Sequence, residues 1–247
     1  MMNDQERRLF VAWRRPDRNI VPVGLLTQQV IDGALHYRFQ YLKVAERQTG
    51  FLPLPGLPDL HVAYQAPALF PVFANRVMPR DRPDYADFLE QLDLDSEADP
   101  FEVLERSEGI RATDRVEVFP VPRSVDGQLT TLFFARGIRH REGADRVVDT
   151  LAAGDELTLQ PQPDNDFNPR AILMNTRTGE CVGWAPDYLL DLIHELQDLN
   201  GAWPAVTVEH VNNSEVPPHL RLLCRLTSPW PQNYAPFSGP DFQPIAS

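Results

Sequence analysis

The chain has 247 residues, of which 43% are hydrophobic and 23% are charged, and its formal net charge at pH 7 is −12. This length allows one large domain or two small ones, and the composition excludes a fibrous or wholly disordered chain. Both halves of the chain are net negative. A surface coated in phosphate-binding side chains is therefore excluded, and any nucleic-acid site must be local. The 24 prolines favour loops and short strands over long helices.

The N-terminus and the two cysteines bear on where the protein resides. Residues 1–8 are polar, and the apolar run at 9–13 is too short for a signal peptide. The sequence contains no run of about 18 apolar residues, so no membrane span is predicted. Cys181 and Cys224 each lie in an apolar stretch without a Cys or His at ligand spacing. This favours reduced core residues in a cytoplasmic protein over a disulfide or a metal site.

Residues 1–122 are predicted to form a mixed α/β module. Short apolar or alternating segments at 9–13, 22–26 and 36–41 have the pattern of strands. Residues 52–83 contain seven prolines, too many for regular elements. Extended loops are therefore expected there.

Two helices are expected to complete this module. Pro83 can open the first, whose apolar side chains recur at helical spacing. In the second, Asp99 is the expected N-cap, Pro100 lies in the first turn and Gly109 is the expected C-terminal cap. The acidic residues from Asp81 to Asp99 follow the helix period, which favours solvated helix faces over a metal cluster.

Residues 123–228 are predicted to form a second domain, a small β-barrel with one main helix, so the fold class of the whole chain is α+β. Six segments have strand patterns, at 129–138, 156–160, 171–174, 181–184, 206–211 and 220–226. The helix is expected to begin at Pro186-Asp187, to end at Gly201 and to bury Leu189, Leu190, Ile193, Leu196 and Leu199. Residues 229–247 hold five prolines without periodicity and are expected to form a strap or a flexible tail.

No catalytic signature is present. The sequence lacks a G-x-x-x-x-G-K-[ST] phosphate loop, a G-x-G-x-x-G turn, an H-E-x-x-H helix and a G-x-S-x-G elbow. The six histidines are scattered, and no nucleophile has a readable base beside it. We therefore predict a protein that is not an enzyme and uses neither a cofactor nor a metal. Scattered residues can still converge in space, so a hydrolase or a nuclease remains an alternative.

The informative stretch combines basic side chains with an aromatic loop. Arg136, Arg139, Arg141 and Arg146 form the densest basic segment of the acidic chain. The turn-rich segment 164–169 projects Phe167 between short amide side chains. An exposed ring beside a local positive patch is typical of single-strand binding, because the ring stacks on an unpaired base. Alternatively, Phe167 caps the barrel and the arginines pair with Glu142 and Asp145.

Residues 129–227 contain four informative segments, Gly137-Ile138-Arg139-His140, Gly154-Asp155-Glu156-Leu157-Thr158-Leu159, Pro163-Asp164-Asn165-Asp166-Phe167-Asn168-Pro169-Arg170-Ala171-Ile172 and Val182-Gly183-Trp184-Ala185-Pro186. In order and spacing, these segments resemble the HIRAN domain. HIRAN domains are similar to OB-folds, and the best understood one captures the 3′ end of single-stranded DNA. The resemblance therefore implies an OB-like barrel that binds single-stranded DNA or DNA ends.

The resemblance also implies roles for single residues. Arg139 would contact phosphate, His140 and Phe167 would take the places of two stacking tyrosines, and Asn165 and Asn168 would hold the terminal nucleotide. With the neighbouring basic side chains, the predicted nucleic-acid-binding residues are Arg136, Arg139, His140, Arg141, Asn165, Phe167, Asn168 and Arg170. Asn168 stands where the family has an Asp that accepts from the terminal hydroxyl, and Arg170 stands where it has Asn. Binding of single strands is therefore a firmer expectation than selection of a 3′ end.

The first half contains the segments Val23-Gly24-Leu25-Leu26, Tyr37-Arg38-Phe39, Leu52-Pro53-Leu54-Pro55 and Phe70-Pro71-Val72-Phe73-Ala74-Asn75-Arg76-Val77-Met78-Pro79. These segments resemble, more loosely, the N-terminal region of HipA-type serine/threonine kinases. In that family this region packs on a kinase core and helps to contact an antitoxin partner. No kinase core follows here, so the resemblance implies docking of a partner protein without phosphoryl transfer.

The sequence as a whole predicts a DNA-binding accessory protein that recruits a partner protein. Its HIRAN-like domain would recognise single-stranded DNA or strand ends, and its N-terminal module would dock the partner. The alternative is a protein-interaction or regulatory subunit without intrinsic DNA affinity, which the net charge of −12 favours.

Overall fold

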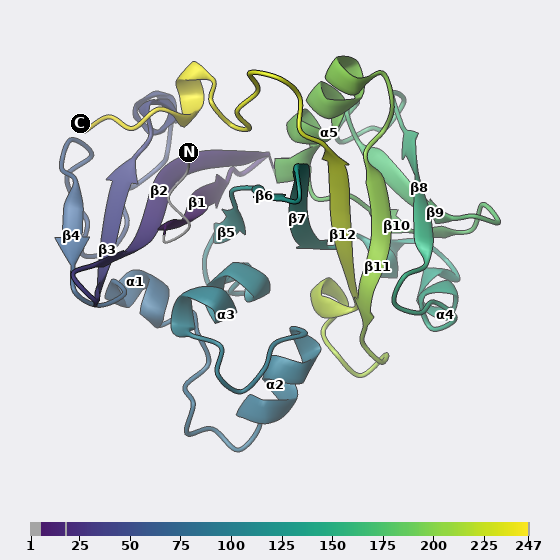
Figure 1. Cartoon of the computed structure of the whole chain (residues 1–247), viewed down its shortest axis with the longest axis horizontal. Helices are drawn as coiled ribbons and strands as arrows, with labels where there is room; N and C mark the ends of the chain where they lie inside the picture. Colours follow the sequence, from purple (N-terminus) through teal and green to yellow (C-terminus); the bar gives the residue numbers. More distant parts are fainter. Residues whose placement is uncertain (1–5, 18, 247) are drawn as a thin grey trace. The chain divides into compact units, whose positions relative to one another are not determined.

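The computed structural model describes residues 6–17 and 19–246 and divides into two compact units (Figure 1). The first unit comprises the described residues of ranges 1–90, 94–121 and 237–247, and the second comprises 91–93 and 122–236. Each contains an antiparallel sheet with few helices, as expected for an α+β protein. None of the helices in the described part of the chain is long and apolar enough to cross a membrane.

The first unit is built on a five-stranded sheet with the order β4-β3-β2-β1-β5. Its strands are β1 (Glu6–Arg14), β2 (Ile20–Ile31), β3 (Ala34–Tyr41), β4 (Tyr64–Ala66) and β5 (Val116–Pro120). Its helices are α1 (Pro71–Ala74), α2 (Tyr85–Gln91) and α3 (Pro100–Ser107), with the 3-10 turns η1 (Lys43–Arg47) and η4 (Pro240–Phe242). The prediction of extended loops throughout 52–83 was wrong at β4 and α1. Both elements are short, which explains why the prolines hid them.

Strand β1 is buried on both faces, which accounts for its continuous apolar run. Leu9, Val11 and Trp13 point into the main core of the unit. Phe10 points the other way, and its ring centroid lies 5.4 Å from that of Phe237 and 5.1 Å from that of Phe242. The end of the chain therefore covers the second face of β1.

Backbone hydrogen bonds fix this C-terminal segment to the first unit. Lys43 N–H donates to the Gln243 carbonyl over 2.9 Å, and Ile245 N–H donates to the Tyr41 carbonyl over 2.9 Å. The segment predicted as a single tail, 229–247, is thus a strap whose residues up to 236 belong to the second unit and whose later described residues belong to the first. The aromatic contacts on β1 decide this, and no local sequence pattern carries them.

Helix α3 begins as its sequence indicates. Asp99 Oδ1 accepts hydrogen bonds from the backbone N–H groups of Phe101 and Glu102, at 2.8 and 2.9 Å, as the N-cap prediction required. The C-cap is Glu108, with φ of 57°, and not Gly109, which follows it with φ of 56°. Two consecutive residues in the left-handed region turn the chain toward β5.

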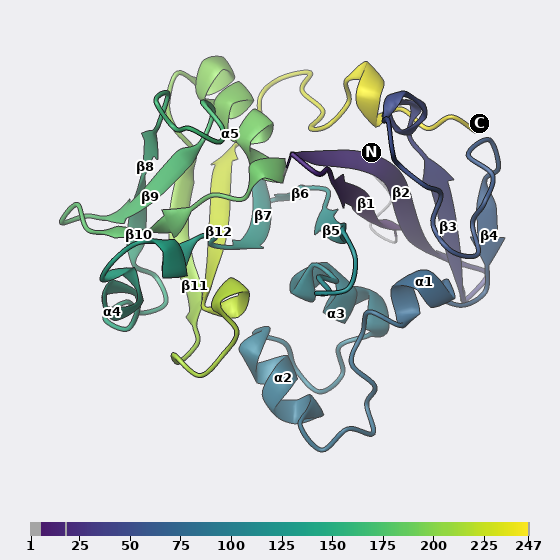
Figure 2. The same cartoon turned by 180° about the vertical axis from the view of Figure 1, so that it is seen from behind.

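The second unit is built on a seven-stranded sheet with the order β10-β9-β8-β11-β12-β7-β6. Its strands are β6 (Arg123–Val125), β7 (Gln128–Phe134), β8 (Glu156–Pro161), β9 (Ile172–Thr176), β10 (Cys181–Trp184), β11 (Ala205–Val211) and β12 (Leu222–Pro229). Its helices are α4 (Ala144–Val148) and α5 (Asp187–Asn200), with the 3-10 turns η2 (Ile138–His140) and η3 (Pro218–Leu220). Helices α5 and α4 lie at opposite ends of this sheet in both views (Figures 1 and 2).

Helix α5 follows the predicted bounds and buries most of the predicted face. Leu189, Ile193 and Leu196 are at most 1% exposed, and Gly201 provides the left-handed C-cap with φ of 69°. Leu199 is 57% exposed, so its predicted burial was wrong. It lies in the last turn, beyond the edge of the core that the rest of the helix covers.

The predicted barrel is not closed by strand pairing within the described residues. The ladder ends at β6 on one side and at β10 on the other. One isolated bridge joins Arg136, just after β7, to Trp184 at the end of β10. Two predicted strands are also shorter than expected: the strand predicted at 129–138 ends at Phe134, before η2, and the strand predicted at 220–226 begins only at Leu222, after η3.

We expect Asp99→Ala to lower the free energy of unfolding of the first unit by about 0.5–2 kcal/mol, the usual value of an N-cap. Asp99→Asn should cost less, since an amide oxygen still caps the helix, although the 2.7 Å ion pair with Arg7 is lost. Equilibrium urea unfolding of the two variants measures the difference. Equal losses for Ala and Asn would show that the cap contributes nothing.

Candidate nucleic-acid interface

The bridge between Arg136 and Trp184 positions the predicted basic segment. Arg136 N–H donates to the Trp184 carbonyl, and Trp184 N–H donates to the Arg136 carbonyl, both over 2.8 Å. The pairing stops the extended chain after β7, and η2 follows at once. The side chains of Arg139 and His140 are therefore carried by a tight turn at the end of the strand.

Two glycines permit this close approach. Gly137 has φ of 70°, and a Cβ on it would lie 2.6 Å from the Trp184 ring. Gly183 has φ of 137°, and a Cβ on it would lie 2.6 Å from the Arg136 carbonyl oxygen. Both positions therefore exclude side chains, by backbone conformation and by space.

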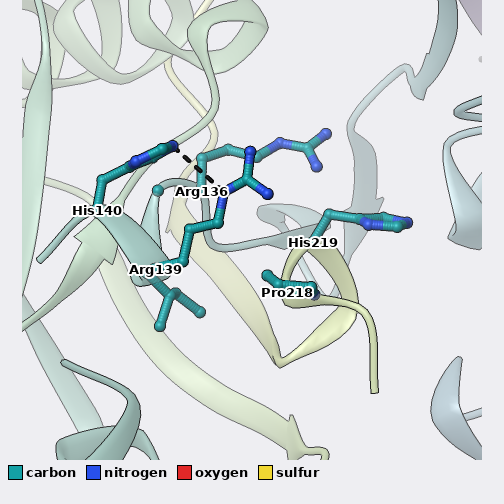
Figure 3. A pocket seen from close by; sticks show the side chains of 7 residues that line it. Arg136, Arg139, His140, Pro218 and His219 are labelled. Atoms are coloured by element: carbon teal, nitrogen blue, oxygen red, sulfur yellow. Dashed lines mark hydrogen bonds between the residues drawn. The ribbon is translucent and has the colours of Figure 1, made fainter. Parts of the chain in front are cut away.

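An open pocket of about 200 Å³ lies between η2 and η3. We call it the basic pocket, because it is lined by four basic side chains and no acidic one; its residues are Arg136, Gly137, Ile138, Arg139, His140, Pro218 and His219. Figure 3 shows Arg139 rising between His140 and Arg136, with His219 on the opposite side from His140. Arg139 Nε–H donates a long hydrogen bond of 3.4 Å to His140 Nε2. The pocket is thus a local positive site on an acidic chain.

His219 is the titrating group that reports on this pocket. Its pKa is lowered below the usual 6.5, first by burial and then by the positive charge of Arg136. Both causes favour the neutral ring over the protonated one. An anion placed between His219 and Arg136 would act in the opposite direction and raise the pKa.

A buried arginine holds the η3 side of the pocket. Arg221, which follows η3 directly, is 1% exposed. Its guanidinium donates to the Asn212 carbonyl and, over 2.7 Å, to Asp149 Oδ1. Since Asp149 follows α4, and α4 follows η2, this side chain ties the segments that carry the two sides of the pocket.

The aromatic loop, residues 162–171, presents its ring to solvent. Phe167 is 80% exposed, which contradicts the alternative in which it caps a barrel. Asn165 Oδ1 accepts hydrogen bonds from the N–H groups of Phe167 and Asn168, at 3.0 and 3.1 Å. Asn168 Oδ1 accepts from Arg170 N–H over 3.0 Å. These amide side chains build the turn that holds the ring outward.

The other predicted contacts fall in three places. Arg170 pairs with Asp191 at 3.1 Å on α5, so its guanidinium is already engaged. Arg146 is exposed on α4 and does not line the basic pocket. Asp145 was expected to pair with the arginines of the basic segment. It pairs instead with Arg221, between η3 and β12, at 3.7 Å from Nε.

Trp184 connects the basic pocket with the aromatic loop. The Arg141 guanidinium lies 5.5 Å from the centre of its ring, within the range of a cation–π contact. Its Nε1–H donates over 2.9 Å to Gln162 Oε1, which also accepts from Asn165 Nδ2 over 3.4 Å. A continuous set of contacts therefore runs from η2 through Trp184 to the base of the Phe167 turn.

The sequence predictions omitted Trp184, His219 and Arg221 as site residues. Trp184 could have been found, since it follows Val182-Gly183 in a segment already singled out. His219 and Arg221 lie in a stretch without a motif, and η3 meets η2 only in the folded chain. No local signal identifies them.

Solved structures similar to this chain include two that match over 41% of its length. A protein from Lactobacillus plantarum, a structural-genomics target, has 20% sequence identity and a TM-score of 0.34, with 99% of its own chain covered. The HIRAN domain of human HLTF has 20% identity and a TM-score of 0.32, with 74% of its chain covered. No family model and no curated protein matches. The interpretation of the site therefore depends on its own geometry, and the resemblance to HipA gains no support.

We expect Gly137→Ala to destabilise the second unit more than Gly143→Ala. Both glycines have positive φ, which costs about 1–2 kcal/mol for a residue with a Cβ. Only at Gly137 does the new methyl group also meet the Trp184 ring, whereas the space around Gly143 is open. Overpacking should add about 1–3 kcal/mol, measured by urea unfolding. Equal losses would show that the contact with Trp184 is relaxed without cost.

We also expect an NMR titration to give His219 a pKa below 6.5, and Arg136→Gln to raise it, because a positive charge is removed. Arg146→Gln should leave it unchanged. Since the unfolded chain binds this proton more tightly than the folded one, stability decreases as the pH falls below the usual pKa of histidine. A value of 6.5 or higher in the unmodified protein would contradict the assignment.

Proposed function

We propose that this chain is a DNA-binding accessory protein whose second unit binds single-stranded DNA or strand ends. The observation that carries the proposal is the arrangement of the second unit. In an acidic chain, a pocket lined only by basic and neutral residues is joined through Trp184 to a loop with an exposed phenylalanine. These are the two components that single-strand binding requires, a cationic track for the backbone and a ring for the bases.

The phosphate backbone would lie along η2. Arg139 and Arg141 extend from this turn, and the guanidinium of Arg139 lines the pocket while that of Arg141 lies over Trp184. A guanidinium group can bind two phosphate oxygens at once, and its binding releases counterions from the DNA. The affinity for DNA should therefore fall as the salt concentration rises. The acidity of the remaining surface opposes wider contact with duplex DNA.

Bases would stack on Phe167. A ring that is 80% exposed offers one face to a base at little cost in reorganisation, because Asn165 already holds the turn. His140 is exposed at the mouth of the pocket and provides a second flat group. Stacking is tolerant of sequence, since every base has a π-face.

Selection of a 3′ hydroxyl is not part of this proposal. The oxygens of Asn165 and Asn168 accept hydrogen bonds from the backbone of their own loop. A terminal hydroxyl would have to compete with those donors, and the loop offers it no charged acceptor at Asn168. We therefore propose recognition of unpaired nucleotides without strict polarity.

We propose that the first unit docks a partner protein. The hairpin between β2 and β3 exposes the apolar side chains of Val30, Ile31 and Leu35, each 42–46% accessible. Val30 and Leu35 are register partners on one face of this hairpin, and Ile31 lies on the other face. Exposed apolar side chains are a common feature of protein-binding surfaces. The first unit then recruits the partner that the second unit brings to DNA.

Fluorescence anisotropy with 3′-tailed, 5′-tailed and blunt oligonucleotides tests the DNA-binding proposal. We expect the tailed oligonucleotides to bind more tightly than the blunt one, and Phe167→Ala to weaken binding by about 1–3 kcal/mol through loss of a stacked base. Leu199→Ala is the matched control, because it also removes an exposed apolar side chain from the second unit. Arg139→Gln should weaken binding and reduce its dependence on salt.

Two results would contradict the proposal. One is the absence of binding at low salt, which would favour a regulatory subunit without DNA affinity. The other is equal behaviour of Phe167→Ala and Leu199→Ala, which would remove the aromatic loop from the site. Degradation of the oligonucleotide with Mg²⁺ or Mn²⁺ would instead favour a nuclease.

A further inference from the structure

The basic pocket is separate from the aromatic loop and has the size of a small anion site. None of the residues that line it belongs to the loop. Its volume of about 200 Å³ is below the range of about 300–1,000 Å³ that holds drug-sized ligands. A base stacked on Phe167 therefore leaves this pocket for a different chemical group.

The charge around the pocket exceeds what one internal phosphate needs. Arg136 and Arg139 are permanently charged, and the imidazoles of His140 and His219 line the same pocket. A phosphodiester carries one negative charge and two free oxygens. A phosphate monoester carries a charge of about −1.5 to −2 at pH 7 and three acceptor oxygens. Basic groups on both sides of a small pocket match the monoester better.

The position of His219 gives a second argument, based on geometry. It faces Arg136 from η3, with Arg139 and His140 on the η2 side, and no carboxylate lines the pocket between them. The nearby carboxylates of α4 and its end, Asp145 and Asp149, are paired with Arg221. A dianion in the pocket would therefore meet basic groups from both sides, and the residues that line the pocket include no carboxylate.

We propose that the basic pocket is a subsite for a phosphate monoester and that, on the proposed function, its ligand is the phosphorylated end of a DNA strand. The guanidinium groups of Arg136 and Arg139 hold two oxygens, and His219 donates to the third. A dianion in the pocket raises the pKa of His219, against the lowering by burial and by Arg136 in the free protein, so its binding favours the protonated ring. Affinity for the phosphorylated end should therefore rise as the pH falls, as long as the phosphate keeps its second charge.

Four oligonucleotides of one sequence test the proposal in the full-length chain. One pair differs only at the 5′ end, which carries a phosphate or a hydroxyl. The other pair differs in the same way at the 3′ end. We expect one phosphorylated end to bind about tenfold or more tightly than its hydroxyl counterpart, the effect of one charge-assisted hydrogen bond. His219→Gln should reduce this ratio, because the third oxygen loses its imidazole donor while Arg136 and Arg139 still hold the other two. Phe167→Ala should weaken both members of a pair and keep the ratio, and Arg146→Gln should change neither.

Inorganic phosphate tests the pocket without DNA. In an NMR titration it should shift the His219 ring resonances and raise the pKa of His219, and Arg139→Gln should weaken both effects. This result supports the subsite even if no oligonucleotide binds. In that case the proposed function is contradicted and the phosphate subsite is not. Equal binding of all four ends, with Phe167 still required, overturns the subsite and leaves the proposed function standing. Absence of any phosphate-induced shift at His219 also overturns it.

Discussion

Two hydrogen bonds between Arg136 and Trp184 are the constraint on which the geometry of the second unit depends. They join the end of β7 to the end of β10, where the sheet would otherwise have two unconnected edges. The chains can approach only because Gly137 and Gly183 have no side chains. The same contact ends the strand, begins η2 and places Trp184 between the arginines and the aromatic loop. Gly137 and Gly183 thus have the same physical role, which is to let two backbone segments approach closely.

A buried guanidinium complements this bridge on the other side of the pocket. Removing Arg221 from water is costly, and its bonds to the Asn212 carbonyl and to Asp149 offset that cost. The result is a pocket whose two sides are held by fixed contacts before any ligand arrives, which reduces the ordering that binding must impose. Asp145 and Asp149 are paired with Arg221, and neither lines the pocket. A local positive site can therefore persist on a chain with net charge −12.

Sequence patterns predicted well those elements whose signal is local. Asp99 caps α3, Gly201 ends α5, and the alternating segments of both halves form strands near the expected bounds. The failures have a common cause. The predicted strands at 129–138 and 220–226 both extend into residues that border the pocket. In the structure, those residues belong to or lie next to the 3-10 turns η2 and η3. An apolar pattern cannot show where pairing with a distant strand interrupts the extended chain.

The sequence by itself determined the fold class, most of the strands, and the arginines and aromatic loop proposed as a nucleic-acid interface, because periodicity, capping and turn chemistry act over a few residues. Tertiary structure alone decided that the C-terminal segment covers β1 in the first unit, that Leu199 is exposed, and that His219 and Arg221 belong to the pocket. These features depend on contacts between residues far apart in the chain. Packing, burial and the charge of a distant neighbour set them, and none of these leaves a pattern in neighbouring residues.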